Sequence, residues 1–386
     1  MAFVEAMGDV SHTSRLLLFR LADATLTPVT NGTSRERSPT WSLDGRTLYF
    51  VSNRDGAGDL WQQQISPGGD LSGAPRAVTV GAGMRRATLC PDGSMFAYSN
   101  GRLVGNIWRV PIFEGRSATW ADAEQLTFDQ GWVEYLDISP DGHHIAFSSD
   151  SGGRTTIWTM TLDDGKLQRL TTQPTLDWYP RWSPDGQTLV FYSLRSGNRD
   201  IWTLSVETGE TRQLTDETSM DFGPAWSADG SFVFFASVRS GNSDIWVTSS
   251  DGGEARQLTT HAAGDAYQET SPDGNWLVFA STRGGGAFRL WKMATAGGGP
   301  ELVSEASLGF LRLSKDGSAV YFVGDHDYLG HLWSVSVQDG AERALTDFSG
   351  RRGALGDTAL ATDGKYLYFV WEENLGDIWV MDVVTE

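Results

Sequence analysis

The chain has 386 residues, a formal net charge of −19 and a pI of about 4.7. This charge excludes a general affinity for nucleic acid, because a phosphate backbone requires a cationic surface, whereas it suits a self-repelling surface or a basic partner. The single cysteine, Cys90, excludes an internal disulfide. No apolar run approaches the ~20 residues of a membrane span.

The N-terminal residues 1–14 show no hydrophobic period and are predicted to form an irregular lead-in. They also lack the basic start and apolar stretch of a secretory signal. We therefore expect a cytoplasmic protein, or a periplasmic or extracellular one if the sequence is a processed form.

From residue 15 onward the sequence repeats at intervals of roughly 45 residues, which is typical of propeller blades. The clearest unit is residues 180–215, PRWSPDGQTLVFYSLRSGNRDIWTLSVETGETRQLT. Its Asp-Gly hairpin turn and its short β-branched and aromatic runs predict four strands. The turn recurs at Asp44, Asp92, Asp141, Asp185, Asp229, Asp273, Asp316 and Asp363. An aliphatic residue followed by Trp comes after each turn, at Trp61, Trp108, Trp158, Trp202, Trp246, Trp291, Trp333 and Trp379.

The predicted fold is all-β: one eight-bladed β-propeller of four-stranded antiparallel blades over residues 15–386. The last repeat supplies only three strands, whereas residues 15–30 fall in register with the last two strands of a unit. We therefore expect residues 25–30 to complete the C-terminal blade, which would close the ring and remove an open edge. Residues 16–21 and 378–383 compete for the third strand of that blade, and the pattern leaves both open.

The first strand of each blade is expected to line the central channel, and the loop before it to form the mouth. Because strand side chains alternate faces, residues four and six before each Asp-Gly turn should point into the channel. With their aromatic neighbours they form a candidate binding site: Arg86, Tyr135, Asp137, Trp178, Tyr179, Arg181, Phe222, Tyr267, Glu269, Phe310 and Arg312. An aromatic opening with a few charged groups is the usual character of a ligand site, although channel side chains can equally bond one another.

No metal or other cofactor is predicted. Asp59, Asp200, Asp244 and Asp377 precede the aliphatic-Trp pair, but each loop offers few carboxylates for Ca²⁺, which favours local turn bonding. The histidines of the loop from His326 to His331 lack a recognised ligand spacing. No Gly-x-Ser-x-Gly elbow occurs, so a serine-hydrolase domain is not expected.

The units WSPDGQTLVFYSLRSGNRDIWTLSVETGETRQLT and WSADGSFVFFASVRSGNSDIWVTSSDGGEARQLT resemble the repeats of the TolB-like propellers, relatives of the WD-repeat class. The resemblance covers about residues 16–386 and is strongest over residues 171–291. It implies a bacterial propeller that serves as a binding platform, often for other proteins at the envelope. TolB itself has an α/β domain before six blades, so a Tol-Pal role is not implied here.

Three functions remain open, one of which is a detached sensory module whose catalytic or signalling partner lies on another chain. The first is a non-catalytic binding or scaffold module, monomeric, that recognises a protein or peptide partner at the channel mouth through its tyrosines and arginines. The alternative is a carbohydrate-active enzyme, a lyase or hydrolase that acts on an acidic oligosaccharide in the same funnel. Similar repeats also occur in some polysaccharide lyases and in prolyl-oligopeptidase-like peptidases. In the enzyme, Tyr179 or His261 would act as the base. The lack of a clear base cluster favours the binding module.

Overall fold

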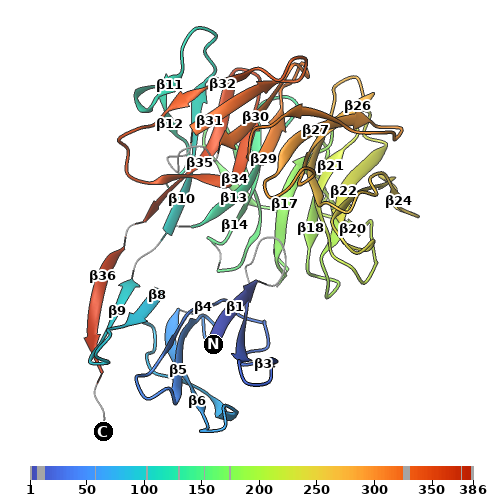
Figure 1. Cartoon of the computed structure of the whole chain (residues 1–386). Coiled ribbons are helices and arrows are strands. Elements are labelled where there is room, and N and C mark those ends of the chain that lie inside the picture. Colours follow the sequence, from blue (N-terminus) through green and yellow to red (C-terminus); the bar gives the residue numbers. More distant parts are fainter. Residues whose placement is uncertain are drawn as a thin grey trace. The chain divides into compact units, whose positions relative to one another are not determined.

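The computed structural model describes residues 2–6, 14–56, 58–100, 103–128, 131–151, 153–173, 175–324, 331–374 and 376–383. Nearly all of the regular structure is β-strand, and the strands form antiparallel sheets apart from one short parallel pair (Figure 1). The chain divides into two compact units, one made of residues 1–103 and 374–386 and the other of residues 104–373. The β-propeller prediction is confirmed.

The larger unit contains six four-stranded sheets in its described part. Five of them are continuous in sequence, with strands numbered from the innermost outward. These are β13 (Val133–Ile138), β14 (His144–Ser149), β15 (Thr156–Thr161) and β16 (Leu167–Arg169); β17 (Asp177–Trp182), β18 (Thr188–Ser193), β19 (Asp200–Ser205) and β20 (Thr211–Gln213); β21 (Asp221–Trp226), β22 (Phe232–Ser237), β23 (Asp244–Ser249) and β24 (Arg256–Gln257); β25 (Asp265–Thr270), β26 (Trp276–Ser281), β27 (Arg289–Ala294) and β28 (Glu301–Ser304); β29 (Leu308–Leu313), β30 (Ala319–Gly324), β31 (His331–Ser336) and β32 (Glu342–Ala344).

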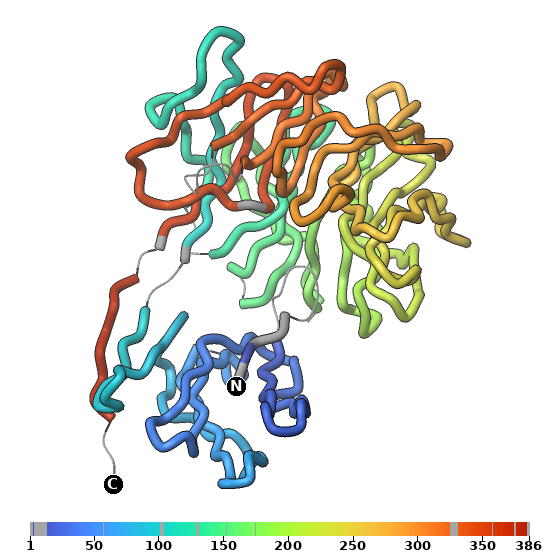
Figure 2. The backbone as a smooth tube through the Cα atoms, viewed as in Figure 1, coloured from blue at the N-terminus to red at the C-terminus, as the bar shows by residue number. Residues whose placement is uncertain are grey.

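The sixth sheet closes this unit into a ring with strands from both of its ends. Its order is β12 (Glu124–Gln125), β10 (Leu103–Pro111), β35 (Tyr366–Asn374) and β34 (Ala354–Thr362). The inner strand β34 contacts both β13 and β29, so the six inner strands form a closed circle. Figure 2 shows the blue-green segment of β10 beside the red segment of β35 in this sheet. A short parallel pair, β11 (Ala118–Thr119) with β33 (Thr346–Asp347), and the 3₁₀ turn η1 (Trp120–Asp122) add to the closure.

The smaller unit contains one four-stranded and two three-stranded sheets in its described part. The four-stranded sheet consists of β4 (Glu36–Trp41), β5 (Thr47–Ser52), β6 (Asp59–Ile65) and β7 (Leu71–Ala77). One three-stranded sheet has the order β1 (Ala2–Ala6), β2 (Ser14–Arg20) and β3 (Thr25–Pro28). The other has the order β36 (Asp377–Asp382), β9 (Met95–Asn100) and β8 (Met84–Leu89). The predicted irregular lead-in is therefore wrong for residues 2–6, which pair with β2.

The predicted ring closure is also wrong, because β3 pairs with β2 and not with a C-terminal strand. The repeat pattern predicts that β10 pairs with β9 as the third strand of one sheet, and that β36 pairs with β35 as the third strand of another. In the structure these third strands are exchanged: β36 pairs with β9, and β10 joins β35. Neither of the two competing segments fills the third place beside β35. The exchange gives a ring of six sheets rather than the expected eight, with the remaining sheets in the other unit.

The repeated Asp-Gly turn forms for the reason that its sequence suggests. In residues 183–188 the Ser183 hydroxyl donates to the Asp185 carboxylate at 2.5 Å, and the Gln187 amide donates to the same oxygen at 3.0 Å. These bonds hold the pKa of Asp185 below its ordinary value. Gly186 takes the positive φ of 70° that a side chain would resist.

The apolar core lies between neighbouring sheets and is rimmed by a repeated ion pair. Beside β18, Arg195 bonds Asp177 at 2.9 Å, and its guanidinium lies 4.9 Å from the centre of the Trp202 ring. In the next sheet Arg239 contacts Asp221 at 2.6 Å and lies 4.8 Å from the Trp246 ring. In these two sheets the Trp of the aliphatic-Trp pair therefore packs against the arginine of the ion pair.

Candidate functional site

Four charged side chains from four different sheets meet at the centre of the six-bladed ring. Arg181 of β17 donates two hydrogen bonds to Glu269 of β25, at 2.7 and 3.0 Å. Arg312 of β29 donates to the same carboxylate at 2.6 Å, and it also donates to the backbone carbonyls of Leu136 and Leu360. Asp137 of β13 lies 3.5 Å from Arg181. We call these four residues the central ion cluster.

The central ion cluster is buried and electrically balanced, with two arginines and two carboxylates. The side chains of Arg312 and Glu269 are 4% and 10% exposed. Burial alone would raise the pKa of Glu269, but the attraction of Arg181 and Arg312 outweighs burial and keeps the pKa below its ordinary value. Glu269 therefore remains ionised, and the cluster lies at the centre of the ring.

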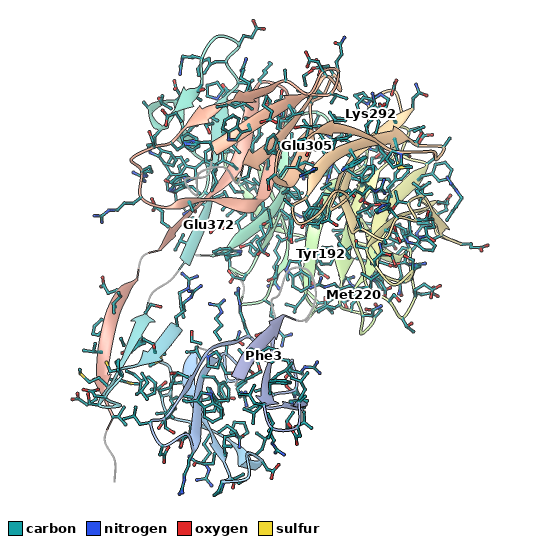
Figure 3. The ribbon with its side chains drawn as sticks, in the orientation of Figure 1. Phe3, Tyr192, Met220, Lys292, Glu305 and Glu372 are labelled. Atoms are coloured by element: carbon teal, nitrogen blue, oxygen red, sulfur yellow. The ribbon has the colours of Figure 1, made fainter. Side chains whose placement is uncertain are left out.

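A layer of aromatic rings lies next to the cluster. The rings of Tyr135 and Tyr179 are 4.9 Å apart between centroids, and Tyr179 lies 5.5 Å from Phe310 on the opposite side of the ring of sheets. Tyr267 lies 5.9 Å from Phe310. Tyr192 of β18, labelled in Figure 3, also packs against Tyr135 and Tyr179. These contacts join the aromatic side chains of four inner strands into one cluster.

Three of these tyrosines have a backbone conformation that residues with side chains rarely adopt. The φ angles of Tyr135, Tyr179 and Tyr267 are 52°, 62° and 56°. Gly223 occupies the equivalent place in β21 with a φ of 59°. In each strand the pairing register shifts around this residue, which is the mark of a β-bulge. Left-handed tyrosines cost roughly 1 kcal/mol or more each, and such strain is often found at ligand sites.

The predicted channel-facing residues therefore converge, but they fill the centre instead of lining an opening. Tyr135, Tyr179 and Phe310 are only 2%, 3% and 1% exposed. Trp178 is also buried and stacks on Tyr192, whereas Tyr267 remains partly exposed. The expectation that the tyrosines form an accessible rim is wrong for Tyr135 and Tyr179.

Two further predicted residues do not join this cluster. Phe222 of β21 is buried, with 7% of its surface exposed. Arg86 belongs to β8 in the smaller unit, because the third-strand exchange places β8 and β9 outside the six-bladed ring. Tyr192 was not predicted, because it stands on a second strand. Its size could have identified it, since the equivalent residues of neighbouring sheets are Ser148, Ala236 and Ala280.

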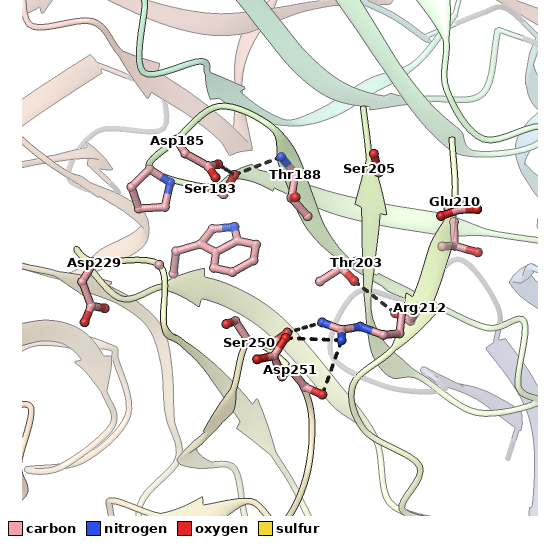
Figure 4. A pocket seen from close by; sticks show the side chains of 14 residues that line it. Ser183, Asp185, Thr188, Thr203, Ser205, Glu210, Arg212, Asp229, Ser250 and Asp251 are labelled. Atoms are coloured by element: carbon pink, nitrogen blue, oxygen red, sulfur yellow. Dashed lines mark hydrogen bonds and ion pairs between the residues drawn. The ribbon is translucent and has the colours of Figure 1, made fainter. Parts of the chain in front are cut away.

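Grooves run between neighbouring sheets on the side of the Asp-Gly turns. One groove of about 710 Å³ lies between the sheets β17–β20 and β21–β24 (Figure 4). Arg212 crosses this groove and donates to the Ser250 carbonyl at 2.5 Å, and Trp226 lines it. The Trp226 indole donates to the Arg181 backbone carbonyl at 3.0 Å, which ties the groove wall to a strand of the central ion cluster. A second groove of about 630 Å³ follows between β21–β24 and β25–β28.

Within the described residues no group of three or more metal-ligating side chains comes together. Residues 325–330, which include His326, lie outside the described part of the chain. His261 is exposed, and its Nδ1 accepts a hydrogen bond from the Ala263 amide at 3.0 Å. The described helical structure contains no segment with the length and apolar character needed to cross a bilayer.

The radial sheets, closed ring and filled axis define a β-propeller. Residues 173–356 match the family model described as the TolB beta propeller domain. The solved structures that resemble this chain include a TolB candidate of Agrobacterium tumefaciens, with 22% identity, 70% of this chain and 99% of that chain covered, and a TM-score of 0.60. They also include TolB of Acinetobacter baumannii, with 16% identity, 86% and 80% coverage, and a TM-score of 0.53. Residues 173–356 are therefore similar to the TolB beta propeller domain, and the likeness to these solved structures shows that the chain shares their fold.

Two curated relatives align with smaller shares of this chain than these solved structures do. An uncharacterised protein of Agrobacterium fabrum is 32% identical over 37% of this chain and 60% of its own length. An uncharacterised peptidase of Bacillus subtilis, YuxL, is 28% identical over 42% of this chain and 22% of its own length. The chain thus spans less than two thirds of either relative.

Proposed function

We propose that this protein is a non-catalytic binding module that recognises a protein or peptide partner at the mouth of the six-bladed ring. The observation that carries the proposal is the set of left-handed tyrosines Tyr135, Tyr179 and Tyr267, whose rings contact one another or Phe310. Residues in strained conformations persist only where the surrounding structure holds them, and they cluster at ligand contacts. The TolB-like fold adds a fold-level analogy.

In this proposal the buried aromatic rings and the central ion cluster form a rigid floor, and the partner contacts the side chains that remain accessible. Tyr267 is the tyrosine of the set that stays partly exposed. A partly exposed aromatic residue on a rigid base loses little side-chain entropy on binding, which is characteristic of binding hot spots.

Two observations favour the binding module over the carbohydrate-active alternative. That enzyme needs an arginine to neutralise a uronate, but Arg181 and Arg312 are both already bonded to Glu269. It also needs a base, but burial raises the pKa of Tyr179 above its ordinary value, which makes the phenol harder to deprotonate.

A phage-displayed library of random peptides, selected on the immobilised protein, tests the proposal. Peptides enriched on the native protein should bind Tyr267→Ala at least tenfold more weakly, because the variant lacks the aromatic contact. Tyr321→Ala, which changes a half-buried tyrosine on β30, is the matched control and should retain binding. Equal binding to both variants would refute the mouth as the site. New unsaturated ends in a panel of uronate oligosaccharides would instead establish the lyase alternative.

A further inference from the structure

In seven of the described sheets a strand contacts the segment that follows it through a repeated set of hydrogen bonds. In β19 the Ile201 amide donates to the Thr215 hydroxyl at 3.0 Å, and the Ile201 carbonyl accepts from the Leu214 amide at 2.8 Å. The same amide-to-threonine bond occurs at 2.9–3.0 Å in the other sheets where a Leu-Thr or Val-Thr pair closes the unit. These sheets place the amide of Leu16, Leu60, Ile107, Ile157, Ile245 or Leu332 against a threonine.

The aspartate before the aliphatic-Trp pair adds side-chain contacts to this recognition. The Asp200 carboxylate accepts hydrogen bonds from the side-chain amide of Gln213 at 3.2 Å and from the Thr215 hydroxyl at 3.5 Å. Asp244 accepts from Gln257 and Thr259 at 3.1 and 3.2 Å. A third strand that begins with Asp-Ile-Trp is therefore a receptor for an extended Gln-Leu-Thr segment.

Strand β36 carries the same receptor sequence, Asp377-Ile378-Trp379, but its outer edge is open in the described part of the chain. Its hydrogen-bonded neighbour there is β9 alone, on one side. Ile378 is 81% exposed, whereas Ile201, Ile245 and Ile157 at the equivalent place are 0% exposed. Trp379 and Val380 are 53% and 65% exposed.

The direction of the backbone groups shows which atoms are available at this edge. The Val383 amide donates to the Ser94 carbonyl, and the equivalent Val206 amide donates to the Gln187 carbonyl. The backbone amides and carbonyls of the odd-numbered residues of β36 therefore point toward β9. By the strand alternation, the amides and carbonyls of Ile378, Val380 and Asp382 face outward. A sheet edge with unpaired amides and exposed apolar side chains is a template for strand addition.

We propose that the outer edge of β36 binds an extended segment of a partner protein with the pattern Arg-Gln-Leu-Thr, by β-strand addition. The threonine would accept from the Ile378 amide, the glutamine and threonine would donate to Asp377, and the leucine would cover Ile378. The arginine would lie opposite Val380, as Arg212 lies opposite Thr203, and Asp377 and Asp382 favour it electrostatically. β36 belongs to the smaller unit and Tyr267 to the six-bladed ring, so the two tests change different residues.

A labelled peptide with the sequence of residues 210–216, Glu-Thr-Arg-Gln-Leu-Thr-Asp, is the probe, with fluorescence anisotropy as the measurement. A matched peptide with valine in place of the threonine keeps the shape and removes the hydroxyl, and it should bind about tenfold more weakly, as expected for the loss of one or two hydrogen bonds. Equal affinity of the two peptides would overturn the proposal.

Variants of the edge test the strand geometry. Val380→Pro removes an outward amide but leaves the bonds to β9, and it should weaken peptide binding at least tenfold. Val380→Ala shortens the same side chain and keeps the amide, so it should weaken binding far less. Both variants should retain the native melting transition. Undiminished binding by Val380→Pro would contradict strand addition.

Hydrogen exchange identifies any other occupant of the edge. The amides of residues 378, 380 and 382 should exchange rapidly in the free protein and become protected when the peptide is added. Protection of these amides in the free monomer would mean that the chain covers its own edge. Protection that rises with protein concentration would mean that a second copy covers it. Either result would overturn the proposal.

Discussion

Glu269→Gln should strongly destabilise the six-bladed ring, because this carboxylate is the common partner of two buried arginines. Three hydrogen bonds of 2.6–3.0 Å reach it from Arg181 and Arg312. Glutamine keeps the volume but removes the charge, so two guanidinium groups would share Asp137 as their remaining anion. Removal of one partner from a buried ion pair costs about 3–5 kcal/mol. In a domain of this size that corresponds to a fall in Tm of about 6–20 °C.

Urea unfolding of the native protein and of Glu269→Gln at pH 7 measures this free energy. The double variant Arg181→Leu with Glu269→Leu should recover much of the loss, because Arg312 and Asp137 then remain as a balanced pair. Asp251→Asn is the control on the surface, where the Arg212–Asp251 pair is exposed and should contribute less than about 1 kcal/mol. A loss below about 1 kcal/mol for Glu269→Gln would refute the assignment of the cluster as the structural axis.

The same carboxylate gives stability a defined dependence on pH. The pKa of folded Glu269 lies below its ordinary value of 4.5, so ionised Glu269 stabilises the fold above about pH 4.5. This stabilisation is lost as the pH falls from 4.5 through the folded-state pKa. Glu269→Gln should therefore lose less stability on acidification than the native protein, and urea unfolding at pH 7 and pH 3.5 would show the difference. Parallel losses in both proteins would contradict the low pKa.

Three further predictions concern other contacts. Arg239→Ala should destabilise the ring by about 2–4 kcal/mol, because it leaves Asp221 buried without its cation and uncovers Trp246; chemical denaturation measures this, and an unchanged midpoint would contradict it. Tyr179→Ala should cost about 3–5 kcal/mol in the same assay, as expected for a fully packed aromatic ring, whereas a near-native Tm would restore the view that this tyrosine is a surface contact. The Asp229 carboxyl should titrate by NMR with a pKa of about 2, because hydrogen bonds from neighbouring serines stabilise its ionised form; a value near 3.8 would show that the turn bonds are absent in solution.

Local patterns predicted the elements of this fold because each pattern has a local cause. The Ser-x-Asp-Gly turns form their own hydrogen bonds within a few residues, as at Asp185. The alternation of side chains correctly placed Asp137, Arg181, Glu269 and Arg312 on one face of their strands, where they meet.

The ring closure was not predictable in the same way. Ile107-Trp108 in β10 and Ile378-Trp379 in β36 have equivalent third-strand patterns, so either can pair with either second strand. The choice depends on long-range packing, which a repeat pattern does not contain. The burial of Tyr135 and Tyr179 was missed for a related reason. It results from bulges and from mutual contacts across the ring, including those with Tyr192, which no single unit encodes.

The sixth sheet of the ring has a consequence for how the protein is made. Its strands β10 and β12 leave the ribosome before the five continuous sheets, and β34 and β35 leave after them. Each of the five continuous sheets can assemble from neighbouring hairpins. The sixth sheet can form only after β34 and β35 have been synthesised, and its formation closes a very long loop. During synthesis β10 is thus an exposed edge without its final partner, and chaperone binding or mispairing would be expected first at that strand.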